Sequence, residues 1–244
     1  MMKHNSLEKL LVLTGAGISA ESGLKTFRGS DGLWEGYRVE DVATPEAWER
    51  NKELVLRFYN ERRAQALRAS PNLAHQQLGY LQQLFPNTKI VTQNVDDLHE
   101  RGGAHEVLHL HGSLFRSRSV LDPRLTYPIG EKGLNLGDYC DKGAQLRPDI
   151  VWFGESVPLM DEAVRLAENA SEFWIIGTSL LVYPAASLYE FVPDNCPIVL
   201  IDPGDTPHWL SERIGPTRFR HLQLPATRGV SMLLKERGLD FPQP

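Results

Sequence analysis

The chain has 244 residues, of which 41% are hydrophobic and 23% are charged, and its formal net charge is -5. This composition is typical of a globular protein with one sizeable core, and its acidic balance argues against nucleic acid as a partner, because phosphate binding needs a concentrated basic surface. The sequence has no apolar run of about 18 residues that could span a membrane, and its two cysteines, Cys140 and Cys196, are too few for a disulfide framework or a four-cysteine zinc site.

No hydrophobic secretory segment precedes the first predicted strand, so we expect a cytoplasmic protein without a membrane partner. The sequence does not indicate an oligomeric state, and a monomer is the expectation.

The first predicted element is a buried parallel strand at residues 10–14, which leads directly into Gly15 and Gly17. The two glycines are expected to let the backbone pass close to a bulky anionic ligand, and the helix start that follows suits a pyrophosphate. An ordinary structural turn has the same G-x-G-x-x-A pattern and remains the alternative at this point. Residues 26–34 form a polar loop where a ribose-binding strand would normally lie, so a bound dinucleotide is expected to be covered by this loop.

A helix is predicted from Thr44, its N-cap, to about Ala69, with Pro45 in the first turn. Within it, Tyr59 and Arg62 lie three residues apart and share one face. The spacing alone favours solvated Arg62 and Arg63 side chains beside a half-buried Tyr59.

Polar side chains follow the next predicted strand, residues 89–92, which comes after a helix that begins near residue 72. Gln93, Asn94 and Asp96 stand at the carboxyl end of that strand, where open α/β sheets bind ligands. Ordinary capping of backbone N–H groups by Asp96 is the alternative.

A further strand is predicted at residues 107–112, and its alternation places His109 and His111 on one face. A metal site would need a third ligand nearby. We therefore expect one imidazole to be a general base at the strand end and the other to be packed and hydrogen-bonded.

The remaining segments complete an α/β pattern. Residues 113–147 have no clear period and predict an irregular surface module. Beyond them we expect strands at 149–155, 173–179 and 198–202, and helices at 160–170 and after residue 186. About six parallel strands separated by helices predict a Rossmann-like sheet. The large domain is expected to contain 7–25, 71–112 and 148–240, and a small domain is expected to be built from two insertions, 26–70 and 113–147.

Six motifs occur in order along nearly the whole chain. They are Gly15-Ala16-Gly17-Ile18-Ser19, Thr26-Phe27-Arg28, Gln93-Asn94-Val95-Asp96, His109-Leu110-His111-Gly112, Val151-Trp152-Phe153-Gly154-Glu155 and Gly177-Thr178-Ser179. This series resembles the motifs of the sirtuins, which are NAD-dependent protein lysine deacylases. The resemblance implies a cleft between the two domains where NAD and an acylated-lysine protein substrate meet, with nicotinamide and O-acyl-ADP-ribose as products.

The resemblance also implies residue roles. His111 is expected to be the general base that takes a proton from a ribose hydroxyl, with Asn94 as the second catalytic residue. The residues expected to hold NAD are Gly15, Ala16, Gly17, Ile18, Ser19, Glu21, Thr26, Phe27, Arg28, Trp34, Gln93, Asn94, Val95, Asp96, His111, Gly177, Thr178, Ser179, Leu200, Ile201 and Asp202. The residues expected to pair with the substrate backbone as an added strand are Val151, Trp152, Phe153, Gly154 and Glu155.

Three stretches, residues 26–34, 38–46 and 58–63, are similar to the class III, or desuccinylase-like, branch of the sirtuins. In that branch a tyrosine and an arginine three residues apart bind the terminal carboxylate of a succinyl- or malonyl-lysine. The similarity implies this role for Tyr59 and Arg62, and guanidinium is well suited to bidentate binding of a carboxylate.

The chain departs from the family pattern in two places. Most sirtuins hold a structural zinc with two cysteine pairs, whereas residues 113–147 contain only Cys140 and no histidine, so no zinc is expected. Leu200 stands where many relatives have an asparagine for the adenosine ribose, so we expect a lower affinity for NAD or a substitute role for Asp202. The apolar residues expected to pack the metal-free module are Leu121, Leu125, Tyr127, Ile129, Leu134, Leu136 and Tyr139.

Two other functions stay open. A sirtuin-fold ADP-ribosyltransferase or NAD hydrolase would share the pocket, but it would not need Tyr59 and Arg62. A non-catalytic module that binds NAD or ADP-ribose would not need the base His111.

Overall fold

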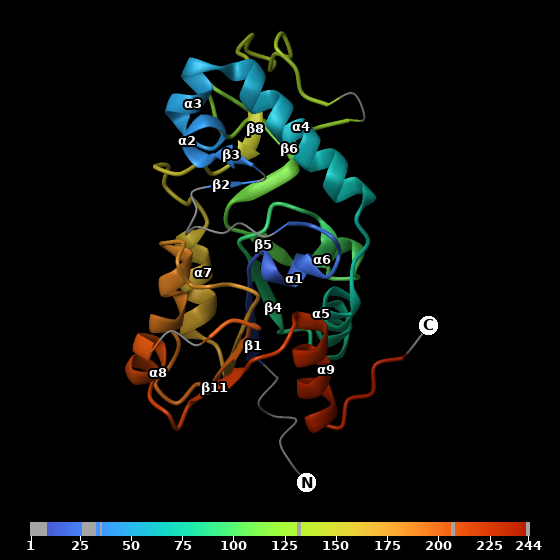
Figure 1. Cartoon of the computed structure of the whole chain (residues 1–244), viewed down its shortest axis with the longest axis vertical. Helices are drawn as coiled ribbons and strands as arrows, with labels where there is room; N and C mark the ends of the chain where they lie inside the picture. Colours follow the sequence, from blue (N-terminus) through green and yellow to red (C-terminus); the bar gives the residue numbers. More distant parts are fainter. Residues whose placement is uncertain (1–8, 26–32, 35, 131–132, 206–207, 243–244) are drawn as a thin grey trace.

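The computed structural model describes residues 9–25, 33–34, 36–130, 133–205 and 208–242. Two layers lie one above the other (Figure 1). The lower layer is built on a six-stranded sheet, and the upper layer consists of helices and two smaller sheets.

The lower sheet is entirely parallel, with strand order β11-β10-β9-β1-β4-β5. Its strands are β1 (Leu10–Thr14), β4 (Lys89–Thr92), β5 (Val107–His109), β9 (Glu172–Ile176), β10 (Ile198–Ile201) and β11 (Phe219–Leu222). Strand β1 lies at the centre, where an unbroken apolar run is buried on both faces. The chain builds one half of the sheet through β4 and β5 and the other through β9, β10 and β11, so the strand order reverses beside β1.

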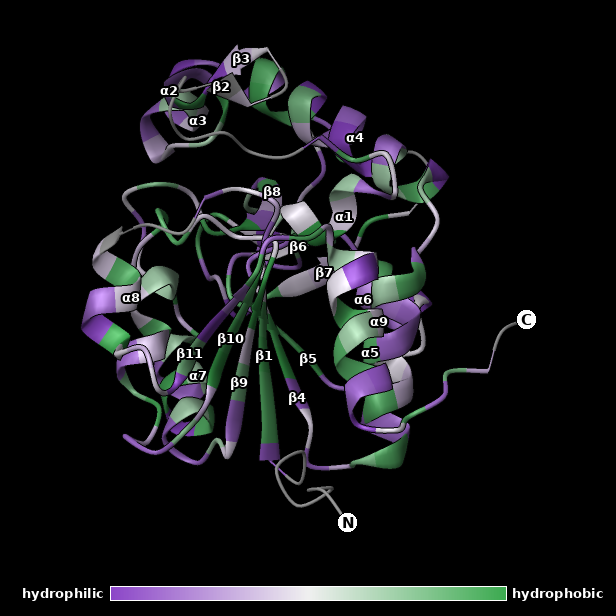
Figure 2. Cartoon of the chain, turned by 60° about the horizontal axis from the view of Figure 1, so that its bottom comes forward, coloured by the Kyte–Doolittle hydropathy of each residue, from purple (hydrophilic) through white to green (hydrophobic). Residues whose placement is uncertain are grey.

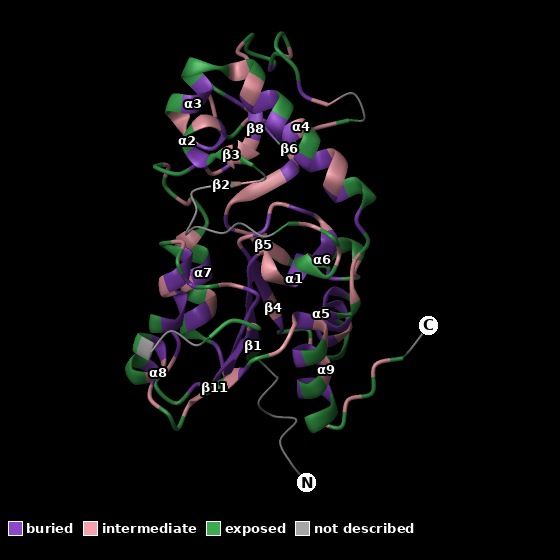
Figure 3. Ribbon diagram, in the orientation of Figure 1, coloured by how far each residue is buried: buried purple, intermediate pink, exposed green. Residues whose placement is uncertain are grey.

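Helices cover both faces of this sheet and turn their apolar sides toward it (Figure 2). On one face lie α5 (Leu73–Leu84) and α9 (Ala226–Glu236), with the short α1 (Gly17–Ala20) and α6 (Leu98–Arg101) beside them. On the other face lie α7 (Met160–Glu168), the 3₁₀ helix η3 (Ala185–Glu190) and α8 (His208–Ile214). The inner strands β10, β9, β1 and β4 are almost wholly buried between the two helical layers, whereas the edge strands β5 and β11 are largely of intermediate burial (Figure 3).

The upper layer has a core of its own. Its elements are β2 (Leu33–Trp34), β3 (Tyr37–Arg38), α2 (Val39–Val42), α3 (Pro45–Arg50), α4 (Lys52–Arg68), β6 (Gly112–Ser119), β7 (Thr126–Pro128) and β8 (Leu146–Ile150). Strands β7, β6 and β8 form an antiparallel sheet in that order. Trp48, Phe58, Tyr59, Leu114 and Trp152 are buried in one cluster. Two stretches far apart in the sequence therefore share this core.

Arg101 joins the two layers. Its guanidinium donates hydrogen bonds to the carbonyl oxygens of Ala66 at 3.0 Å and Ala69 at 2.6 Å, at the end of α4, and it lies 3.4 Å from the Asp97 carboxylate. The last carbonyl groups of a helix have no partner within the helix. Arg101 satisfies two of them and fixes the end of α4 to the lower layer.

The helix predicted from Thr44 to Ala69 is two helices. Thr44 is the N-cap as predicted, since its Oγ1 accepts a hydrogen bond from the Ala47 amide at 3.0 Å. The prediction missed Asn51, whose side chain accepts a hydrogen bond from the Leu54 amide at 3.0 Å and so ends α3 and begins α4. Asparagine competes in this way for backbone N–H groups.

Three strand predictions were wrong. The strand predicted at 107–112 ends at His109, because a turn precedes Gly112, which has φ +85° and no room for a Cβ against the Asp149 carbonyl. Residues 113–147, predicted to be irregular, contain most of β6 and all of β7. The strand predicted at 149–155 is not in the parallel sheet: β8 ends at Ile150 and pairs with β6, and β11 is the sixth parallel strand instead. The predicted domain boundary at residue 148 thus falls inside β8.

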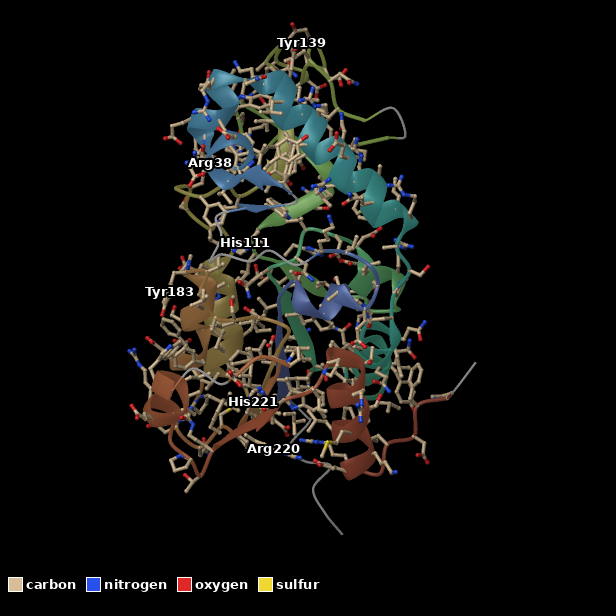
Figure 4. All side chains as sticks on the ribbon, viewed as in Figure 1. Arg38, His111, Tyr139, Tyr183, Arg220 and His221 are labelled. Atoms are coloured by element: carbon tan, nitrogen blue, oxygen red, sulfur yellow. The ribbon has the colours of Figure 1, made fainter. Side chains whose placement is uncertain are left out.

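Two smaller predictions also change. The helix predicted after residue 186 is the 3₁₀ helix η3. Of the residues predicted to pack the metal-free module, Leu134 is buried and Leu125, Tyr127 and Ile129 pack against the upper core. However, Leu121, Leu136 and Tyr139 are exposed, and Tyr139 lies at the far tip of the upper layer (Figure 4). Among the described residues, no helix combines the length and apolar character needed to cross a membrane.

Candidate functional site

A cavity of about 830 Å³ lies between the two layers, at the carboxyl ends of β1, β4 and β9 where the strand order reverses. His111 lies between the layers, at this level (Figure 4). The predicted site residues that line the cavity are Gly15, Ala16, Gly17, Ser19, Glu21, Trp34, Tyr59, Arg62, Gln93, Asn94, Val95, Asp96, His111, Val151, Trp152, Phe153, Gly154, Glu155, Gly177, Thr178, Ser179, Ile201 and Asp202.

Two predicted cofactor-binding residues do not reach this cavity. Ile18 is fully buried among apolar residues under α1, and Leu200 is buried in the apolar cluster on the face of the sheet covered by α7. Their side chains face the core, and their roles in cofactor binding stay predictions. Residues Thr26, Phe27 and Arg28 lie outside the described part of the chain.

The turns that follow β1 and β9 touch each other through glycines. The Gly17 amide donates to the Gly177 carbonyl at 2.8 Å, and a Cβ on Gly17 would lie 2.6 Å from Gly177 Cα. A Cβ on Gly15 would collide with Gly177 and Thr178. The contact between the two turns therefore requires glycine at both positions, and both glycines also line the cavity.

Most amide groups of the first turn are used within the chain. Those of Gly15, Gly17, Ile18 and Ser19 all donate to carbonyl groups of the same two turns. Among the described residues the amide of Ala16, which lines the cavity, has no such acceptor. In the described first turn, the Ala16 amide is thus the backbone donor that remains beside the adjacent turn after β9, which contains Thr178 and Ser179.

Ser19, Asn94 and Asp96 form a buried polar floor to the cavity. The Ser19 hydroxyl donates to Asp96 Oδ2 at 3.1 Å and accepts from Asn94 Nδ2 at 3.2 Å. Asp96 Oδ1 accepts from the Leu98 amide at 3.1 Å. The carboxylate therefore binds a backbone N–H group, as the capping alternative expects, and it also lines the cavity. Burial raises the pKa of Asp96, although its hydrogen bonds to Leu98 and Ser19 oppose the shift. The floor fixes the Asn94 amide group toward the cavity.

Two fully buried histidines lie beneath this floor, and no motif singled them out. His75 Nδ1 lies 3.2 Å from the Asn72 amide nitrogen and 3.0 Å from Asn72 Oδ1, and its Nε2 lies 3.5 Å from Ser19 Oγ. The His99 ring lies 5.0 Å from the His75 ring, and its Nε2 lies 2.9 Å from Thr14 Oγ1. Burial lowers the pKa of both, that of His75 to about 4. Both imidazoles are therefore neutral at pH 7 and support the floor as uncharged groups.

His111 has the geometry of a base. Its Nδ1 lies 3.1 Å from the Gln93 carbonyl oxygen, and since a carbonyl can only accept, Nδ1 carries the proton and Nε2 has the lone pair. Burial lowers the pKa of His111, against the opposing effect of this hydrogen bond. The neutral, proton-accepting form therefore prevails at pH 7.

His109 is the packed, hydrogen-bonded histidine of the pair. Its Nδ1 lies 3.0 Å from the Asn94 carbonyl oxygen and its Nε2 lies 2.7 Å from the Glu100 carboxylate. Burial alone would lower the pKa of His109, but the hydrogen bond and charge of Glu100 outweigh it and raise the pKa. The His109 ring thus fixes the Asn94 backbone through its hydrogen bond to the Asn94 carbonyl.

The upper side of the cavity is formed by α4. Tyr59 is 1% exposed, and its phenol oxygen accepts a hydrogen bond from Trp152 Nε1 at 3.0 Å. Burial raises the pKa of Tyr59, so the phenol stays protonated. Arg62 is 9% exposed, and its guanidinium lies 4.9 Å from the Phe58 ring centre and 3.7 Å from the Glu61 carboxylate. A phenol and a guanidinium therefore line the same part of the cavity, among apolar neighbours.

The segment 151–155 is not a strand. Its backbone donors at Val151, Trp152, Phe153 and Glu155 are all bonded within the chain. In the described structure the Gly154 amide has no backbone acceptor, whereas the Trp152 carbonyl already accepts from the Glu155 amide at 3.0 Å. The Glu155 carboxylate is occupied by arginines of the upper layer.

The end of the cavity near α9 is the part that the sequence indicated most weakly. Glu21 accepts hydrogen bonds from the amide and hydroxyl of Thr227, at 3.0 and 2.8 Å, so its carboxylate caps α9. Pro225 and Ala226 line the cavity next to it. Asp202 Oδ1 accepts from the Gly204 amide at 2.8 Å, and burial raises the pKa of Asp202. No turn or periodic signal in the sequence associates α9 with the glycine motif.

Other lining residues were not predicted as site residues, although Ala20 belongs to the G-x-G-x-x-A pattern and Ala43 to the stretch 38–46. They are Ala20, Leu24, Lys25, Ala43, Gln65, Ala66, Leu114, Ile150, Val157, Val182, Tyr183, Pro203 and Gly204. In the described ranges, no group of three or more His, Cys, Asp or Glu side chains is arranged to hold a metal ion. The zinc content stays a prediction, which elemental analysis of the purified protein would test.

Comparison with known proteins gives consistent results. The family model described as "Sir2 family" matches residues 15–184. The "NAD-dependent protein deacylase" of Helicobacter pylori is 54% identical over 197 residues, which cover 81% of this chain and 85% of the relative. That of Bacteroides thetaiotaomicron is 50% identical over 202 residues, covering 81% and 86%.

Solved structures are similar over almost the whole chain. A "Sir2 homolog-NAD complex" has a TM-score of 0.81 at 38% identity and covers 97% of this chain and 94% of its own. A "Sir2-p53 peptide-NAD+" structure has a TM-score of 0.77 at 29% identity, covering 97% and 99%.

Proposed function

Because the chain belongs to the Sir2 family and is an NAD-dependent protein deacylase like its relatives, we propose that its preferred substrates are lysines that carry succinyl or malonyl groups. Deacetylation would be a second activity of the same site. The observation that carries the proposal is the pairing of Tyr59 and Arg62 in one part of the cavity.

The cavity fits NAD in size and chemistry. A volume of about 830 Å³ is within the range of ligand cavities, and polar groups lie at separate points along it. The Ala16 amide and the hydroxyl groups of Thr178 and Ser179 would hold the phosphates, and Asp202 would bind a ribose hydroxyl near α9. When bound, NAD supplies nicotinamide as the leaving group and the ribose carbon that receives the acyl oxygen.

The reaction centre would be the polar floor together with His111. Asn94 and Asp96 would hold the nicotinamide carboxamide and the ribose, because their positions are fixed by Ser19 and by the α6 amide of Leu98. Nε2 of His111 would accept a proton from a ribose hydroxyl, since Nδ1 is already committed to a carbonyl group.

Arg62 and Tyr59 would bind the distal carboxylate of the acyl group. A guanidinium forms two charge-assisted hydrogen bonds to a carboxylate, and these are stronger in a water-poor pocket than in solution. Acetyl-lysine has no distal carboxylate, so Arg62 would not strengthen its binding.

The test compares Arg62→Met with the wild type on succinyl-, malonyl- and acetyl-lysine peptides, by release of nicotinamide. A charge-assisted hydrogen bond contributes about 1.5–3 kcal/mol, so we expect kcat/KM to fall roughly 10- to 100-fold on the acidic substrates and much less on acetyl-lysine. Arg63→Met is the matched control, since Arg63 bonds to Asn60 and does not line the cavity. Equal losses on all three substrates would refute the proposal.

The same assay distinguishes the other functions. Nicotinamide release without any peptide would favour an NAD hydrolase or ADP-ribosyltransferase, and binding of NAD without release would favour a non-catalytic module. The proposed partners are acylated-lysine proteins, and a cytoplasmic location remains a prediction.

A further inference from the structure

Tyr59 and Trp152 are joined by a buried hydrogen bond between the two halves of the upper layer. The indole Nε1–H donates to the phenol oxygen at 3.0 Å, and the two side chains are only 1% and 2% exposed. The indole has no other polar atom, so its orientation is set by this bond and by its packing.

Arg147 fixes the other side of the indole. Its guanidinium carbon lies 3.2 Å from the centre of the Trp152 ring. It donates to both oxygens of Glu155, at 2.7 and 3.0 Å, and to the Ile150 carbonyl at 2.9 Å. Glu155 in turn accepts the Trp152 backbone amide at 2.8 Å. One ion pair, of the buried Arg147 and the partly exposed Glu155, thus holds both the backbone and the ring of Trp152.

Burying an ion pair costs free energy that its own attraction often fails to recover. Glu155 lines the cavity, but it accepts a further hydrogen bond from Arg118 at 3.1 Å, so both of its carboxylate oxygens are already hydrogen-bonded within the chain. Arg147 does not line the cavity, and it acts on Tyr59 through its contact with Trp152.

A phenol has one donor and an oxygen that accepts. Because Trp152 occupies the oxygen of Tyr59, the hydrogen of that phenol is the group left to bind a ligand. A ligand oxygen is therefore a good partner and a ligand N–H is a poor one. This arrangement selects an acceptor such as a carboxylate.

We propose that Trp152 and Arg147 are positioning residues for acidic acyl groups, since they orient the Tyr59 hydroxyl as a donor into the acyl end of the cavity. The proposal rests on the proposed preference for succinyl- and malonyl-lysine. It assigns to Trp152 a role distinct from pairing with the substrate backbone.

A double-mutant cycle of Trp152→Phe and Tyr59→Phe tests the proposal, with kcat and KM measured on succinyl- and acetyl-lysine peptides. The phenyl ring keeps the packing against Arg147 but lacks the N–H. Loss of one hydrogen bond is worth about 0.5–1.5 kcal/mol, so we expect Trp152→Phe to raise KM for succinyl-lysine roughly three- to tenfold. In the Tyr59→Phe background the same change should raise it less than twofold, because the hydroxyl is already absent.

Two further variants separate positioning from packing. Trp48→Phe is the matched control, since Trp48 is buried in the same cluster, 5.8 Å from Trp152, and should leave the ratio of the two substrates unchanged. Arg147→Lys keeps the charge but loses the planar contact with the indole, and it should raise KM for succinyl-lysine more than for acetyl-lysine. If Trp152→Phe does not fold, Arg147→Lys carries the test.

The outcomes are distinct. A wild-type enzyme with no activity on acidic acyl groups would overturn the proposed function and this inference together. If the wild type acts on succinyl-lysine and Tyr59→Phe impairs it, but Trp152→Phe costs the same with and without the Tyr59 hydroxyl, only the positioning role is overturned.

Discussion

Acid should destabilise this protein in part through His75, whose imidazole is completely buried under the polar floor. Burial lowers the pKa of His75 to about 4, whereas an unfolded chain has a histidine pKa of about 6.5. Between these values the unfolded state binds the extra proton, so stability rises with pH and is lost as the pH falls below 6.5. At pH 5 this group alone should reduce the free energy of unfolding by about 2 kcal/mol relative to pH 7.

Urea unfolding of the wild type and of His75→Gln at pH 7 and pH 5 measures this effect. Glutamine is uncharged at both pH values, so the variant should lose about 2 kcal/mol less than the wild type on acidification, whatever its stability at pH 7. His105→Gln removes an exposed imidazole and is the matched control. If His75→Gln and the wild type lose the same free energy between the two pH values, His75 is not the buried neutral group described above.

Three further predictions follow from single contacts. Gly17→Ala should lower the free energy of unfolding by about 2 kcal/mol or more, because the added Cβ would collide with the backbone of Gly177. Gly130→Ala is the control in the same urea experiment, and because its Cβ would point into open space it should change the free energy of unfolding by less than about 0.5 kcal/mol. Arg237→Met leaves the buried Glu172 carboxylate of β9 without its ion-pair partner and should lower the free energy of unfolding by about 3 kcal/mol. Arg220→Met breaks an exposed ion pair with Glu236 and should lower it by less than about 1 kcal/mol. Similar losses in the two variants would contradict this prediction. His111→Ala should reduce kcat about 100-fold or more. Because burial lowers the pKa of His111, the wild-type kcat/KM should fall only when the pH drops below about 6.5. A decline that begins at higher pH would contradict the assignment of His111 as the base.

The parts of the fold that were predicted correctly have strong local signals. The central strand is an unbroken apolar run, and Thr44 followed by Pro45 marks a helix start that the structure has at that residue. Asn51 gave a weaker signal, because a single asparagine inside a helical pattern is usually tolerated and here its side chain caps a second helix instead.

The errors concern strands whose partners lie far away in the sequence. Residues 149–155 are apolar enough for a buried parallel strand, but Trp152 is buried by the upper core instead. The true edge strand, β11, has the polar residues Arg220 and His221, and its partner β10 decides its conformation.

The candidate site shows the same limit. Motifs identified the residues around the turns after β1, β4 and β9, because loops at one edge of a parallel sheet meet there. They did not indicate that Leu200 faces the core, nor that the Glu21 carboxylate is occupied by α9. Which face a side chain occupies depends on tertiary packing, which a local pattern does not contain.

The hydrogen bonds of Arg101 attach one end of α4 to the lower layer, so the helix would tilt about that end. Tyr59 lies about 10 Å along the helix from Ala66, and Lys52 lies about 21 Å from it. Tilting the upper layer about this pivot would displace the far end of α4 twice as much as the phenol. Tyr59 therefore lies on the half of α4 that is nearer to Arg101, where a tilt of the helix moves a side chain less.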